Sequence, residues 1–147
     1  MRADGQTVQG RLAGPGGAVT YVATAQLDPS DADHAARIDT HRGRRPAAWT
    51  TIECPRPAEL PGVLRATAGV ALVDSLGTWV TGHPDLHVEV GPLIDALRGR
   101  AGTTIVVSEE VGLAPHAPTV LGRRFADVLG QANHAVAAVA DHALLVV

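Results

Sequence analysis

Short apolar runs alternate with amphipathic stretches along this chain, a pattern typical of repeated β-α-β units. Five runs have the composition of strands, and 49–53 is expected at a sheet edge because prolines follow it. The predicted strands are residues 18–23, 49–53, 70–73, 104–107 and 143–147. The runs at 70–73 and 104–107 are continuously apolar, which favours strands buried on both faces of a parallel sheet.

Helical spacing of apolar residues predicts helices between these strands. The predicted helices are residues 31–42, 59–67, 76–80, 88–98 and 119–141, the last as one long helix or a broken pair. In the last one, the residues expected on the buried side are Leu121, Phe125, Val128, Leu129, Ala132, Val136 and Val139. We therefore predict an α/β fold of three layers, a mainly parallel sheet flanked by helices.

Ligands of such sheets bind beyond the carboxyl ends of the strands. Polar side chains follow three of the predicted strands, and topology predicts that they converge. They are Thr24 and Gln26, Asp74, and Glu109 and Glu110. Asp74 suits either a carboxylate that holds Mg²⁺ near nucleotide phosphates or an ordinary turn or helix cap. The two glutamates suit contact with a ribose or a metal, but acids at helix starts are also common.

Length and composition narrow the class of protein. The 147 residues fit one domain, with a loose arm at 1–17 and a core at 18–147. The net charge of −3 argues against a nucleic-acid partner. No apolar run is long enough to span a membrane, and residues 1–10 lack the apolar part of a signal peptide, so a cytoplasmic protein is expected. The lone Cys54 excludes an internal disulfide.

The chain contains no lysine, so all 12 basic residues are arginines. Lysine-based catalysis and a GxxxxGK[ST] phosphate loop are therefore excluded within these residues. The segment best suited to phosphate chemistry consists of His41, Arg42, Gly43, Arg44 and Arg45. An imidazole can attack phosphorus and guanidiniums can hold phosphate oxygens, with Glu53 orienting the imidazole or contacting a nucleotide. A solvated basic turn explains the same spacing equally well.

Several stretches, taken in order, resemble one family. The front half matches at 19–26, 37–38, 41–46, Trp49 and Glu53. The back half matches at 73–76, 107–112, 123–125, Asn133 and 143–147. The family is the bifunctional adenosylcobinamide kinase / adenosylcobinamide-phosphate guanylyltransferase of cobalamin biosynthesis, and the resemblance runs from about Leu12 to Val147.

The resemblance implies a P-loop-NTPase-like fold, a homo-oligomer (usually a trimer), and the substrates ATP, GTP and adenosylcobinamide or its phosphate, with Mg²⁺. It implies phosphorylation of adenosylcobinamide, followed by GMP transfer through a histidine-bound GMP. His41 matches the nucleophile. The positions expected to contact the nucleotide are Thr24, Ala25, Gln26, Arg42, Gly43, Arg44, Arg45, Glu53 and Asp74.

Three departures from the family pattern qualify the resemblance. The first strand and its Gly-Gly-x-Arg-Ser-Gly-Lys-Ser loop have no counterpart in residues 1–10, so we expect kinase activity to be nearly abolished and GTP binding to be weakened. Glu109 stands where asparagine is common, and Gly77 with Thr78 replaces a bulkier pair. Two hypotheses follow: a transferase represented by a shortened chain, or an inactive nucleotide- or corrinoid-binding subunit or fragment.

Overall fold

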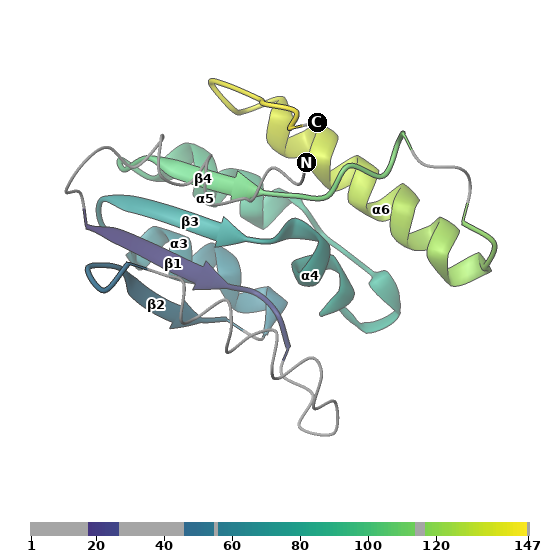
Figure 1. Cartoon of the computed structure of the whole chain (residues 1–147), viewed down its shortest axis with the longest axis horizontal. Helices are drawn as coiled ribbons and strands as arrows, with labels where there is room; N and C mark the ends of the chain where they lie inside the picture. The colour runs from purple at the N-terminus through teal and green to yellow at the C-terminus, as the bar shows by residue number, and fades with distance from the viewer. Residues whose placement is uncertain (1–17, 27–45, 55, 114–116, 147) are drawn as a thin grey trace.

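The computed structural model describes residues 18–26, 46–54, 56–113 and 117–146. Its centre is a sheet of four parallel strands in the order β2-β1-β3-β4. The strands are β1 Val19–Ala23, β2 Thr50–Glu53, β3 Val70–Asp74 and β4 Thr104–Val107. All four arrows point the same way in Figure 1, with β2 at one edge. The predicted parallel sheet and the edge position of β2 are confirmed.

Helices follow the strands as the apolar spacing predicted. They are α3 Leu60–Ala66, α4 Leu76–Thr81, α5 Gly91–Gly99 and α6 Val120–Ala137, with short 3-10 turns η1 Pro57–Glu59 and η2 Pro84–Leu86. Helix α5 begins three residues later than the predicted 88, with Pro92 in its first turn, where a missing N–H costs nothing. Helix α6 begins at the Thr119 cap, whose hydroxyl accepts from the Gly122 amide.

The four α-helices of the described residues contribute to one core on a single face of the sheet. Leu64, Trp79, Leu93 and Leu129 pack there with the sheet residue Val73. The opposite face forms a second cluster, in which the buried residues are Val19, Tyr21, Ala23 and Leu72. Both faces of β1 and β3 are thus buried, as the continuous apolar run at 70–73 predicts for β3, whereas β4, at the edge of the sheet, is only partly buried.

Two predictions about the second half of the chain are wrong. Residues 143–146 form no strand, and Leu144 is 69% exposed. An apolar, strand-prone run needs a neighbour to complete its hydrogen bonds, and this one pairs with none of the four strands. Leu121, expected on the buried side of α6, is exposed because it lies in the first turn, before the helix meets the core from Phe125 onward. The predicted helix at 31–42 lies outside the described residues.

Arg100 ties the amino ends of β3 and β4 together. Its guanidinium donates to the carbonyls of Leu64, Thr67, Gly69 and Thr103 and to the Thr104 hydroxyl, at 2.7 to 3.2 Å. The planar, five-donor head of arginine suits such a cluster of acceptors. This clamp holds the end of the sheet opposite to the polar strand ends.

Candidate functional site at the carboxyl edge

Polar side chains meet where the strands end, and we call this region the carboxyl edge, defined by Thr24, Asp74, Ser75, Thr78 and Glu109. In the sheet register Ala23 lies opposite Asp74, and Asp74 opposite Val107, so the three strands end at the same level. Thr24 directly follows β1, and Glu109 lies two residues beyond the end of β4. The predicted convergence of these polar groups is present.

Thr24 joins the end of β1 to the end of β3. Its amide donates to the Asp74 carbonyl at 3.2 Å, and its hydroxyl donates to the Ser75 carbonyl at 2.8 Å. The same hydroxyl lies 2.6 Å from the Thr78 hydroxyl. Thr24 is only 2% exposed, so it acts as a fixed part of the edge.

Ser75 caps helix α4 immediately after Asp74. Its side chain accepts from the Thr78 amide, and the Thr78 hydroxyl accepts from the Ser75 amide at 3.1 Å, which completes a capping box. Of the two roles considered for Asp74, the helix cap therefore belongs to its neighbour. The Asp74 carboxylate instead accepts a hydrogen bond from the Tyr21 hydroxyl and points to the second face of the sheet.

Glu109 connects β4 to the start of α4. One carboxylate oxygen accepts from the Ser75 hydroxyl at 2.7 Å, and the other accepts from the Gly77 amide at 3.0 Å. Helix α6 also reaches this point, because the Asn133 amide group donates to the Glu109 carbonyl at 3.1 Å. The carboxyl edge is thus one connected hydrogen-bond network across β1, β3, β4, α4 and α6.

Other predicted site residues lie elsewhere. The Gln26 amide group turns to the Gly82 carbonyl at 3.2 Å, at the far end of α4, and Glu110 accepts from the Gly112 amide in its own loop. Ala25 adjoins Thr24 and offers no polar side chain. Glu53 ends β2 opposite Ala23, on the outer side of the edge.

The residues predicted to carry the chemistry, His41, Arg42, Gly43, Arg44 and Arg45, lie outside the described residues. Pro46 begins the next described segment, and its carbonyl accepts from the Trp49 amide in the turn that enters β2 at its amino end. The Trp49 ring stacks on Tyr21 with centroids 6.5 Å apart. The turn and the ring stack therefore fix the start of the described segment that follows His41 in the sequence.

Sequence reasoning assigned no site role to Tyr21, Ser75, Thr78 and Asn133. The Ser-x-x-Thr spacing that begins at Ser75 is visible in the sequence and could have indicated the helix cap. Tyr21 looked like an ordinary core residue, and its bond to Asp74 depends on the strand register, which a local pattern does not contain.

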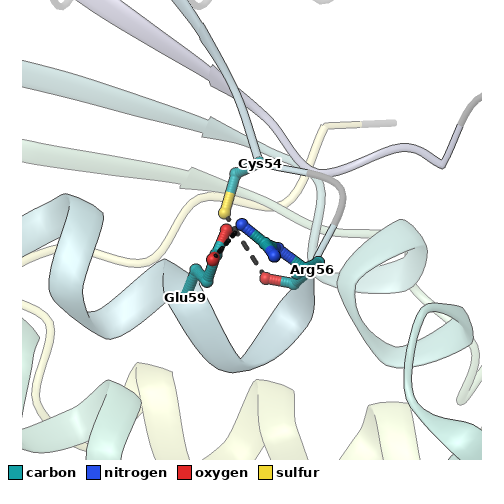
Figure 2. A network of polar contacts seen from close by, with 3 residues as sticks. All are labelled: Cys54, Arg56 and Glu59. Atoms are coloured by element: carbon teal, nitrogen blue, oxygen red, sulfur yellow. Dashed lines mark hydrogen bonds and ion pairs between the residues drawn. The ribbon is translucent and has the colours of Figure 1, made fainter.

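Cys54, directly after β2, is buried and takes no part in the edge. Figure 2 shows its thiol directed to the Arg56 carbonyl, 3.7 Å away, beside the 2.6 Å ion pair of Arg56 and Glu59. Burial, and secondarily Glu59, raises the pKa of the Cys54 thiol, while Arg56 lowers it. The thiol is therefore protonated near neutral pH and is a poor nucleophile.

A parallel sheet with helices packed on it and polar groups at the carboxyl ends of its strands defines an open α/β domain, and this arrangement is consistent with the P-loop-NTPase-like class. The chain matches the family described as cobinamide kinase / cobinamide phosphate guanyltransferase over residues 6–147. This match begins a few residues before Leu12, where the sequence resemblance was expected to start.

Curated relatives agree with that match. The chain is 39% identical over 137 residues to the bifunctional adenosylcobalamin biosynthesis protein CobP of Pseudomonas aeruginosa, covering 86% of this chain and 77% of that protein. It is 31% identical over 158 residues to CobU of Escherichia coli and 32% over 156 residues to CobU of Salmonella typhimurium. Each of these two matches covers 92% of this chain and 85% of the relative. The chain belongs to the cobinamide kinase / cobinamide phosphate guanyltransferase family.

Two features of the described residues bear on partners. Within that part of the chain, no helix is long and apolar enough to cross a membrane. Among the same residues, no group of three or more His, Cys, Asp or Glu side chains is placed to hold a metal ion.

Proposed function

We propose that this protein transfers GMP from GTP to adenosylcobinamide phosphate through a histidine-bound intermediate, with His41 as the nucleophile. The family match over residues 6–147 carries this proposal, because it spans both the His41 segment and the carboxyl edge. The convergence of Thr24 and Asp74 at the strand ends supports it, since nucleotides bind at that edge in open parallel sheets.

The proposed reaction has two displacements at one phosphorus atom. An imidazole nitrogen of His41 attacks the α-phosphorus of GTP, so that a P–N bond forms, the bond to the β-phosphate oxygen breaks and pyrophosphate leaves. A phosphate oxygen of the corrinoid substrate then attacks the same phosphorus, the P–N bond breaks and His41 is released. The guanidiniums of Arg42, Arg44 and Arg45 hold the phosphate oxygens while charge develops on them.

A magnesium ion fits this site only as a partner of the nucleotide. Mg²⁺ commonly binds through one or two protein carboxylates, with phosphates and water completing its coordination. The Asp74 carboxylate, which accepts from the Tyr21 hydroxyl at the end of β3, would supply one such carboxylate, whereas a site made of protein groups alone would need more acidic ligands. When bound, the ion would neutralise phosphate charge; Asp74 would hold it at the end of β3.

His41 must reach the carboxyl edge from the opposite end of β2. Five peptide units extend at most about 18 Å, and the four residues of β2 rise about 13 Å. The sequence separation between His41 and Pro46 therefore permits the imidazole to reach the strand ends, where Glu53 lies. The proposed reaction requires the His41 imidazole to lie close to the strand ends in the nucleotide-bound protein.

The kinase half of the family's activity is expected to be weak in this chain. Phosphoryl transfer in P-loop enzymes uses a lysine on the β- and γ-phosphates, and the 147 residues contain none. A second candidate function, which the same family match allows, is an inactive nucleotide- or corrinoid-binding subunit. We propose a cytoplasmic homo-oligomer in either case, with a trimer expected.

Incubation with GTP labelled at the α-phosphorus tests the proposal. We expect acid-labile, alkali-stable label on the protein, lost in His41→Ala and retained in the matched control His83→Ala, because the His83 ring contacts the carbonyl and ring of Trp79, beyond the end of α4. Label that persists in His41→Ala would refute the nucleophile. GTP binding without any label would instead support the binding-subunit function.

A further inference from the structure

The carboxylate of Glu109 occupies the space that a side chain at position 77 would fill. A Cβ added to Gly77 would overlap this carboxylate, lying 2.6 Å from Glu109 Cδ. The two residues are 32 positions apart, and they come from the end of β4 and the start of α4. Gly77 itself is buried, so a larger residue there would displace the glutamate.

Both oxygens of the Glu109 carboxylate accept hydrogen bonds. Oε1 accepts from the Ser75 hydroxyl at 2.7 Å, and Oε2 accepts from the Gly77 amide at 3.0 Å. Ser75 is only 4% exposed, and its carbonyl accepts from the Thr24 hydroxyl. Any movement of the Glu109 carboxylate therefore alters a hydrogen bond of Ser75, the residue that directly follows Asp74.

We infer that Glu109 is a positioning residue, which uses the space left by Gly77 to fix the Asp74–Ser75 end of β3 for nucleotide binding. This inference rests on the proposed function, since it concerns the same site. Glu109 is itself exposed, so its role depends on these two hydrogen bonds rather than on burial. The pair should act as one unit, because replacing either residue breaks the same contact.

Double-mutant analysis tests the inference with two readouts. Glu109→Ala and Gly77→Ala are each expected to weaken GTP binding, measured by calorimetry, by about 3- to 10-fold, the loss typical of one or two hydrogen bonds. The double variant should be no weaker than either single variant, because the contact is lost only once. Hydrogen exchange at the amides of residues 76–78 should accelerate in all three variants.

Matched controls separate this contact from general effects of substitution. Glu110→Ala removes a neighbouring carboxylate that contacts only its own loop, and Gly62→Ala adds a methyl group to a helix where nothing lies within 4 Å. Both controls should leave GTP affinity and exchange at 76–78 unchanged. Glu109→Gln should retain most of the affinity, because its amide keeps the length and one acceptor.

Three results would overturn the inference. The first is a double variant whose loss is the product of the single losses. The second is unchanged GTP affinity, or unchanged exchange at 76–78, in Glu109→Ala when the unmodified protein binds GTP. The third is an unmodified protein that binds no GTP, which would refute the proposed function and the positioning role together.

Discussion

Replacing Arg100 with alanine should destabilise the domain more than any other exchange of a described arginine. Of its five hydrogen bonds, those to the Leu64 carbonyl, the Thr67 carbonyl and the Thr104 hydroxyl are partly buried, and the other two are exposed. Each partly buried bond contributes about 1 kcal/mol net, so the free energy of unfolding should fall by about 3 kcal/mol. For a domain of this size, that lowers Tm by about 6–12 °C.

Two further variants sharpen this prediction. Arg100→Lys keeps the charge, but one ammonium group cannot reach acceptors in separate loops, so about 2 kcal/mol should still be lost. Arg65→Ala is the matched control, because Arg65 makes one exposed bond of 3.4 Å to the Pro92 carbonyl. Its effect should stay within about 0.5 kcal/mol. Urea unfolding measures all three, and equal stabilities of Arg100→Ala and Arg65→Ala would refute the clamp.

Three smaller predictions use the same unfolding assay. Gly102→Ala should cost about 1–3 kcal/mol, because its Cβ would overlap the Gly69 carbonyl, whereas Gly99→Ala meets nothing within 4 Å and should not destabilise the fold. Gly130→Ala, inside α6 with open space around it, should add about 0.5–1 kcal/mol of stability. The pKa of Cys54 is higher folded than unfolded, so its contribution is complete below the ordinary value of 9.0 and is lost as pH rises through the folded value. Stability should therefore fall above about pH 9 more steeply in the original protein than in Cys54→Ala, and parallel profiles would contradict this.

Local patterns located most of the sheet. Strands β3 and β4 are continuous apolar runs, a pattern that burial on both faces produces in the central strand β3, whereas β4 lies at an edge of the sheet and is only partly buried. The meeting of Thr24, Asp74 and Glu109 also followed from topology, because parallel strands place their carboxyl ends together. The segment 143–146 has the same apolar composition, but strand formation requires a paired neighbour, which composition cannot reveal.

The hydrogen bonds within the carboxyl edge could not be predicted from local sequence patterns. Glu109 and Gly77 each stood out in the sequence as departures from the family pattern, but their contact depends on how β4 and α4 are packed. The bond from the Tyr21 hydroxyl to Asp74 likewise depends on register across β1 and β3. Long-range pairs of this kind are set by tertiary structure and leave no local periodicity.

Transfer of GMP from the protein to a corrinoid tests the central claim most directly. The protein is first loaded with GTP labelled at the α-phosphorus, freed of nucleotide, and then mixed with adenosylcobinamide phosphate. We predict that label leaves the protein and appears on the corrinoid, and that Asp74→Asn slows loading while His41→Ala abolishes it. Label that remains on the protein, or a corrinoid that becomes labelled with His41→Ala, would contradict the account.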